Sequence, residues 1–72
     1  APDRPAEADR TQVWDEAERG YRRAAEVAAA TDDRAAQATA YQTLAAFLHD
    51  RGKYADAAVA YKRVTECAAD LY

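Results

Sequence analysis

The chain has 72 residues, so it forms one small domain at most, and such a domain buries only about 60% of the surface that its unfolded chain exposes. The formal net charge is −3, which argues against the basic footprint of a nucleic-acid-binding domain. No stretch approaches the ~20 consecutive apolar residues of a membrane-spanning helix, so membrane insertion is not expected.

Cysteine usage and overall composition suggest where the protein works. Cys67 is the single cysteine, and a lone cysteine cannot form an internal disulfide, so we expect a reducing, cytoplasmic location. The chain lacks Met, Ile, Ser and Asn and uses more Arg than Lys, a bias typical of a GC-rich bacterial genome.

The N-terminal part of the chain predicts a short arm followed by a helix. Pro2 and Pro5 mark residues 1–8 as a flexible arm, and residues 9–72 form the predicted domain. A helix is expected over 10–30, with Asp9 as its N-cap. Gly20 inside it predicts the close approach of a neighbouring helix or ring. The apolar positions lie three and four residues apart, as on one helix face: Val13, Trp14, Ala17, Tyr21, Ala24, Ala25 and Ala28.

A second helix is predicted over 34–51, after a cap at Asp32 and Asp33. One face is apolar, with Tyr41, Leu44, Ala45 and Leu48. The opposite face carries a row that we call the polar row, made of Thr39, Gln42, Thr43, Ala46, His49 and Asp50.

Gly52 is predicted to end this helix in the left-handed conformation, and a third helix is expected over 54–71. No strand-like alternation occurs, so the predicted fold is all-α, with three antiparallel helices. The residues expected to form its core are Trp14, Tyr21, Tyr41, Leu44, Leu48, Ala57 and Tyr61.

The third predicted helix repeats the first at a spacing of forty residues. Aromatic, arginine and glutamate positions coincide as well as alanines, which helical periodicity alone does not explain. The matching pairs are Trp14 and Tyr54, Ala17 and Ala57, Tyr21 and Tyr61, Arg23 and Arg63, Glu26 and Glu66, Ala28 and Ala68, and Ala29 and Ala69.

This arrangement resembles the tetratricopeptide repeat (TPR) family. The resemblance rests on Tyr41-x-x-Leu44-Ala45-x-x-Leu48, Gly52-x-Tyr54 and Ala57-x-x-x-Tyr61. It implies about one and a half repeats, ordered helix B, helix A, helix B. The spacing of forty exceeds the usual 34, Ala45 replaces the common glycine, and Ala69 stands where a proline often closes the repeat.

The residue inventory argues against an enzyme. There is no serine, and no glycine-rich phosphate loop, since Gly20 and Gly52 stand alone. His49 and Cys67 are predicted to lie on the order of 20 Å apart, too far to form a dyad or share a metal. Cys67 is expected to be a small buried filler. We therefore predict no catalytic residue, no metal and no cofactor.

The TPR resemblance implies a scaffold that binds a protein or peptide partner, and we expect the chain to be part of a larger protein. TPR domains line their groove with the first helix of each repeat, here the polar row. The lysine and asparagine of the chaperone-binding carboxylate clamp are replaced by residues such as Gln42 and Ala46, which argues against a co-chaperone.

Beside the polar row, Phe47 and Ala40 form a predicted apolar strip with no recognisable helix to cover it. The predicted partner surface therefore comprises Thr39, Ala40, Gln42, Thr43, Ala46, Phe47, His49 and Asp50. The alternative is that residues 1–8 fold over Phe47. Two other readings of the whole chain stay open: a homo-oligomer in which another copy completes the repeat, and a microtubule-interacting-and-trafficking (MIT) type three-helix domain.

Overall fold

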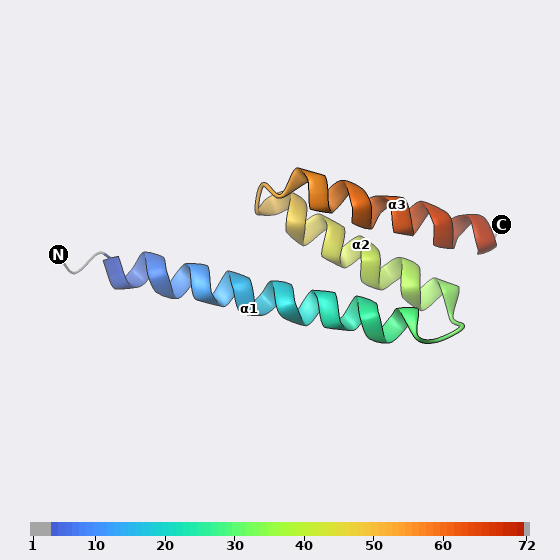
Figure 1. The fold of residues 1–72 in the computed structure, drawn as a ribbon, viewed down its shortest axis with the longest axis horizontal. Helices are drawn as coiled ribbons and strands as arrows, with labels where there is room; N and C mark the ends of the chain where they lie inside the picture. The colour runs from blue at the N-terminus through green and yellow to red at the C-terminus, as the bar shows by residue number, and fades with distance from the viewer. Residues whose placement is uncertain (1–3, 72) are drawn as a thin grey trace.

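A computed structural model describes the backbone of residues 4–71 and the side chains of residues 10–69. It contains three helices: α1 (Arg4–Ala29), α2 (Arg34–Asp50) and α3 (Tyr54–Leu71). Successive helices run in opposite directions (Figure 1), and the described residues include no strand. The predicted all-α fold is confirmed, and the predicted bounds of α3 match those observed.

The start of α1 differs from the prediction, because the helix begins at Arg4 rather than Arg10. Pro5 lies in its first turn, where a missing N–H costs no hydrogen bond, so proline does not exclude a helix there. Residues 4–8 of the predicted arm therefore belong to α1, and Asp9 lies inside the helix instead of capping it. Residues 1–3 of that arm lie outside the described residues.

Local hydrogen bonds at the helix ends set both turns. The side chain of Asp33 accepts a hydrogen bond from the Ala36 N–H at 3.0 Å, as an N-cap does. At the other end of α2, Gly52 has a φ of +80°, and its N–H donates to the His49 carbonyl at 2.9 Å. The Lys53 N–H donates to the Leu48 carbonyl, which completes a Schellman motif. Both predicted capping roles are confirmed.

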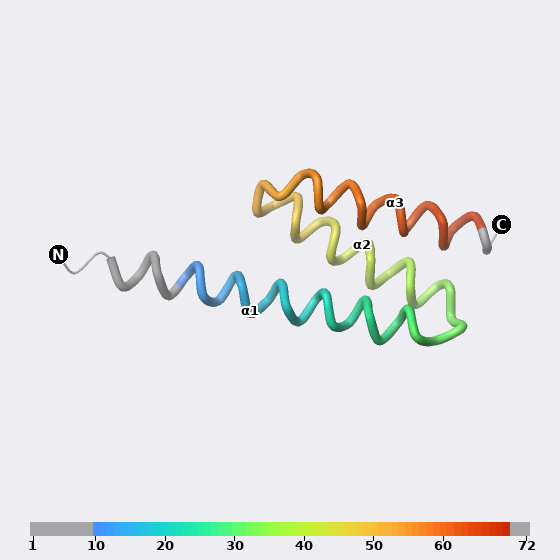
Figure 2. Tube along the Cα trace, viewed as in Figure 1, coloured from blue at the N-terminus to red at the C-terminus, as the bar shows by residue number. Residues whose placement is uncertain are grey.

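The three helices form an open array and not a closed bundle (Figure 2). α2 packs against α1 on one side and against α3 on the other, and no described Cα of α1 lies within 8 Å of one in α3. The molecule extends 55 × 21 × 12 Å, with a radius of gyration of 14.6 Å, against about 11 Å for a compact domain of this length. Only α2 has neighbours on two sides.

The core is thin and is made mainly of α2 and alanines. Leu48 is 1% exposed and is the largest fully buried side chain described. The prediction is right for Leu44, Leu48 and Ala57 but wrong for Tyr21 and Tyr61, which are exposed, while Trp14 and Tyr41 are half-buried. In an open array the outer helices keep one face free, and their aromatic rings lie at these edges. The buried cluster consists of Ala25, Leu44, Ala45, Leu48, Ala57 and Ala60.

The two helices related by the forty-residue repeat do not pack on α2 in the same way. α3 packs on α2 through buried Ala57, Ala60 and Cys67. The corresponding residues of α1 are Ala17, Gly20 and Val27, of which Gly20 and Val27 are exposed. α1 instead meets α2 through a different stripe. The two repeated helices therefore use different faces to hold the same central helix.

Gly20 consequently does not permit a close approach, as the sequence had suggested. A Cβ built at Gly20 would meet no atom within 4 Å outside its own helix backbone. The position lies on the unpartnered face of α1, whereas the matching Ala60 of α3 is buried against α2.

Candidate functional site

The polar row of α2 is exposed. Its two threonines satisfy their hydroxyls within α2. The Thr39 hydroxyl donates to the Ala35 carbonyl at 3.1 Å, and the Thr43 hydroxyl donates to the Thr39 carbonyl at 3.0 Å. The row therefore offers methyl groups and amides at its centre and charge only at its end. Every member has an exposed side chain: Thr39, Gln42, Thr43, Ala46, His49 and Asp50.

The other two residues of the predicted partner surface lie elsewhere. Phe47 packs between Trp14 and Tyr21 of α1, with ring centroids 5.4 and 4.9 Å apart. Ala40 is half-buried and packs against the core cluster. The expectation that no helix covers Phe47 is wrong, because α1 covers it. The alternative cover, by residues 1–8, involves side chains that lie outside the described residues. We call Trp14, Tyr21 and Phe47 the aromatic cluster.

The end of the polar row meets the start of α3. The His49 ring lies edge-on to the Tyr54 ring, with centroids 5.0 Å apart. Asp50 borders a shallow hollow of about 270 Å³ that it shares with Arg10, Thr11, Trp14 and Arg51. Within the described residues, side chains of α1 and α3 extend the predicted surface only at this end of the row.

A cluster of charges joins α1 to the turn between α2 and α3. Glu18 accepts hydrogen bonds from Arg51 at 2.9 Å, from Lys53 at 2.8 Å and from Arg22 at 3.0 Å. Asp15 lies 3.0 Å from the same Arg51 nitrogen. Glu18 thus pairs with Arg22 of its own helix and also holds α1 against the turn after α2. We call these five residues the charge cluster.

The charge cluster changes the acidity of Glu18. The hydrogen bond from Lys53 is the main cause that lowers the pKa of Glu18 to about 2, and Arg22 adds to it. Partial burial opposes this shift because it disfavours the charged carboxylate. The Glu18 side chain is only 13% exposed, so its charge depends on these partners more than on water.

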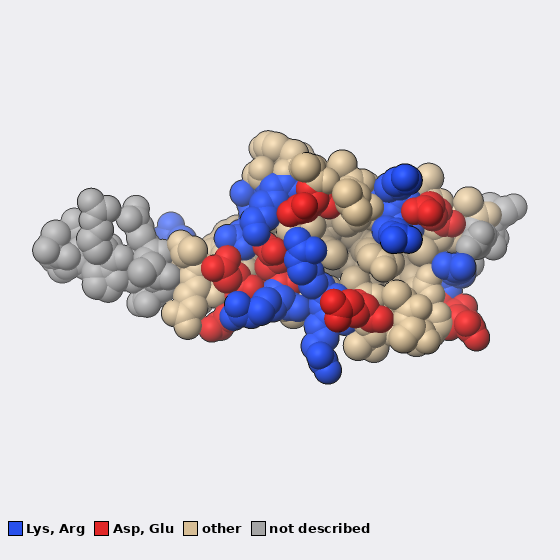
Figure 3. Space-filling model, viewed as in Figure 1, with Lys and Arg blue, Asp and Glu red and all other residues tan. Residues whose placement is uncertain are grey.

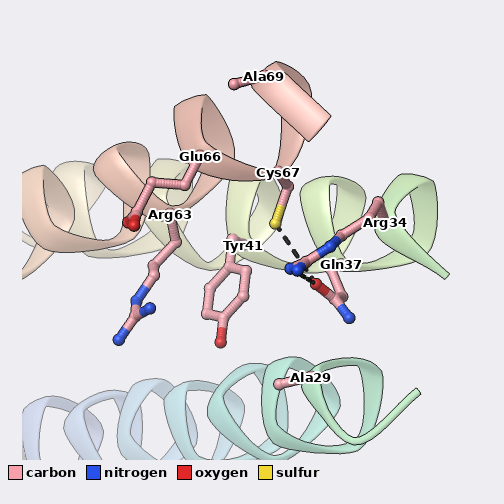
Figure 4. A pocket seen from close by; sticks show the side chains of 8 residues that line it. All are labelled: Ala29, Arg34, Gln37, Tyr41, Arg63, Glu66, Cys67 and Ala69. Atoms are coloured by element: carbon pink, nitrogen blue, oxygen red, sulfur yellow. Dashed lines mark hydrogen bonds between the residues drawn. The ribbon is translucent and has the colours of Figure 1, made fainter. Parts of the chain in front are cut away.

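On the other side of α2, a groove runs between α1 and α3. Two hollows lie along it, of about 570 and 230 Å³, and Tyr41 and Arg63 line both. The side chains of Tyr41 and Arg63 point across it toward α1 (Figure 4). Basic and acidic side chains alternate over this face of the molecule (Figure 3), so the groove carries no strong charge of one sign.

A buried polar side chain closes one end of the groove. Gln37 donates from Nε2 to the Thr31 carbonyl at 2.7 Å, and its Oε1 accepts from Arg34 at 2.9 Å. The Cys67 thiol donates to the same oxygen at 3.5 Å (Figure 4). Gln37 thus ties the first turn, α2 and α3 together. The predicted role of Cys67 as a buried filler is confirmed, since it is 4% exposed.

No protein-family model, curated protein or solved structure matches this chain. The site must therefore be judged on its chemistry. Among the side chains of residues 10–69, no three potential metal ligands of the His, Cys, Asp and Glu types gather at one point. His49 contacts Tyr54, whereas Cys67 contacts Gln37 near the opposite end of α2. None of the described helices is long and apolar enough to cross a membrane.

Sequence reasoning missed the groove and the charge cluster for one reason. Both depend on which face of α1 meets α2, and the apolar pattern of α1 allowed two answers. The spacing of Glu18 between Trp14 and Tyr21 was the available signal, because these three residues share one helix face. A carboxylate between two aromatic residues indicates that this face meets a basic neighbour.

Proposed function

We propose that this chain is a helical protein-interaction module of the TPR type, which binds a polypeptide along the polar row of α2. The observation that carries the proposal is that α2 is held from both sides by α1 and α3 while its polar row stays exposed. A helix fixed in this way presents its side chains in a set register, so a partner that binds there does not have to order them.

The chemistry of the row supports binding rather than catalysis. Its centre is small and uncharged, and Asp50 and His49 at one end are the only members that carry or can take up charge. Such a surface fits the side of an extended or helical polypeptide that brings its own polar groups. A cytoplasmic location and a place within a larger protein are part of the same proposal.

A photo-crosslinking residue placed at Ala46 tests this function in the full chain. We expect crosslinks to a discrete partner protein from Ala46, and none from Val59, an exposed residue of α3 that lines the groove on the other side. The double variant Thr43→Arg with Thr39→Arg should abolish the crosslink while leaving the melting temperature unchanged, because both residues are exposed. Equal crosslinking from Ala46 and Val59, or none from Ala46, contradicts the proposal.

Self-assembly is the second candidate function. It draws on the exposed outer faces of α1 and α3, which in a repeat protein are covered by neighbouring helices. Sedimentation velocity over a hundredfold range of protein concentration distinguishes the two. A concentration-independent monomer favours binding of a different protein, whereas a mass that rises with concentration favours assembly.

A further inference from the structure

The outer side of α3 carries two exposed tyrosines on one helix face. Tyr54 is 63% exposed and Tyr61 is 43% exposed. Ala58 and Thr65 are also exposed and complete the same face, because residues four, seven and eleven positions apart align on a helix. We call these four residues the tyrosine stripe.

The corresponding stripe of α1 already holds a helix. Forty residues before Tyr54 and Tyr61 lie Trp14 and Tyr21, and these two rings pack on Phe47 of α2. The position that matches Thr65 is Ala25, which is 3% exposed at the interface with α2. In α1, this arrangement of side chains therefore packs against a helix, namely α2.

In α3 the same arrangement has no such helix among the described residues. α3 binds α2 through its other stripe, with Ala57, Ala60 and Cys67. The His49 ring touches the tyrosine stripe at its first residue. We propose that the tyrosine stripe of α3 docks an amphipathic helix of a partner polypeptide that carries an aromatic residue between small ones, as α2 does around Phe47. This surface is separate from the polar row of α2, so the inference goes beyond the proposed function.

The two stripes differ in charge at one position, which defines the partner more closely. Glu18 of α1, which binds Arg51 and Lys53, is replaced in α3 by Ala58. A helix on the tyrosine stripe thus finds a methyl group where α2 finds a carboxylate. The docked helix therefore needs the aromatic residue but no basic residues after its last turn.

A peptide of residues 34–50 of this chain is the matched probe, because it contains Phe47 and lacks Arg51 and Lys53. We expect it to bind the isotopically labelled full chain saturably, with NMR shift changes centred on Tyr54, Ala58 and Tyr61. Tyr61→Arg in the full chain should weaken binding at least tenfold, and Tyr54→Arg should do the same. A peptide with Phe47→Ala should bind at least tenfold more weakly.

The matched control is Val59→Arg, an exposed position on the same helix but outside the stripe, which should leave the affinity within about twofold. Melting curves check that each variant keeps the fold. Absence of saturable binding at millimolar peptide overturns the inference, as does equal binding by the Tyr61→Arg chain. Shift changes confined to Trp14 and Tyr21 also overturn it, because the peptide then replaces α2. Crosslinking from Ala46 is independent of this stripe, so the proposed function can survive if the inference fails.

Discussion

The ring of Phe47 in α2 lies 4.9 Å from the ring of Tyr21 in α1, measured between centroids, at an interplanar angle of 48°. This tilted contact, together with Trp14 on the same side, is the main aromatic link between the two helices. Arg51 lies 6.0 Å from the Trp14 ring centroid, so the aromatic cluster also borders the charge cluster. The two clusters together hold α1 in place.

Replacement of Phe47 tests this link. Phe47→Ala should lower the free energy of unfolding by about 1–3 kcal/mol, below the 3–5 kcal/mol typical of a fully buried Phe, because Phe47 is only half-buried. Urea unfolding followed by circular dichroism measures the change. Ala46→Ser on the exposed row is the control and should change stability by less than about 0.5 kcal/mol. An unaltered unfolding midpoint for Phe47→Ala would show that α1 is held by other contacts.

Acid should weaken the structure through Glu18. The pKa of Glu18 is lowered in the folded chain to about 2 from an ordinary value of 4.5, so its ionised form stabilises the fold above pH 4.5. This contribution is lost progressively as the pH falls from 4.5 toward 2. Melting temperatures from pH 7 to pH 2 should therefore drop less steeply in this window for Glu18→Gln than for the unmodified chain.

Glu26→Gln is the control for this pH experiment, because Glu26 is exposed on the same helix. Its pH profile should match that of the unmodified chain. If Glu18→Gln also keeps the full acid dependence, the hydrogen bonds from Lys53 and Arg22 do not stabilise the fold in solution. Added salt should weaken the effect, since the side chains of Lys53 and Arg22, which lower the pKa of Glu18, are 40% and 44% exposed.

Truncation of Leu48 should be among the most costly changes in the chain. Leu48 is the largest fully buried side chain described, and Leu48→Ala should cost about 2–5 kcal/mol of unfolding free energy. Leu44→Ala should fall in the same range. Val59→Ala, at a residue that is mostly exposed, should cost less than about 0.5 kcal/mol. Similar losses at Leu48 and Val59 in denaturant titrations would refute the assigned core.

The two glycines should respond to alanine in opposite ways. Gly20→Ala should stabilise the chain by up to about 1 kcal/mol, because a methyl group meets open space there and alanine favours a helix. Gly52→Ala should destabilise it by about 1–2 kcal/mol, because its φ of +80° is strained for any residue with a Cβ. Thermal unfolding of the two variants side by side gives the answer, and a loss of stability at Gly20 would indicate a neighbour in that space.

Cys67 should be protected from thiol reagents in the folded chain. Because its side chain is 4% exposed, labelling should require opening of the α2–α3 interface and should speed up with added urea. Thr65→Cys in a Cys67→Ala background places a thiol at an exposed position of the same helix and should react at once. Equally fast labelling of Cys67 would mean that α3 leaves α2 readily.

The sequence was most informative where one local interaction decides the structure. Asp33 caps α2 and Gly52 ends it by rules that involve only neighbouring residues, and both were predicted correctly. The apolar face of α2 was equally clear, because Leu44 and Leu48 are its only large aliphatic residues. The fold class followed from these features.

The arrangement of the outer helices was harder to predict. Alanine is common on several faces of α1 and α3, so apolar spacing did not show which face meets α2. Large aromatic rings were assigned to the core because of their size, yet Tyr61 lies on a face with no described neighbour. The position of Phe47 was misjudged for the same reason, because its cover depends on the face that α1 presents. The predicted role of the polar row is compatible with its exposure and stays a prediction.

Among the described residues, the backbones of α1 and α3 do not approach each other, and this has a consequence for the order in which the chain opens. Either outer helix can detach without breaking backbone packing of the other, whereas α2 cannot detach without releasing both. α1 is held by the smaller interface, so its amides should exchange with solvent deuterium before those of α2 and α3. The α2–α3 hairpin is then the slowest-exchanging unit, and a partner that fastens α1 would make the whole chain exchange as one.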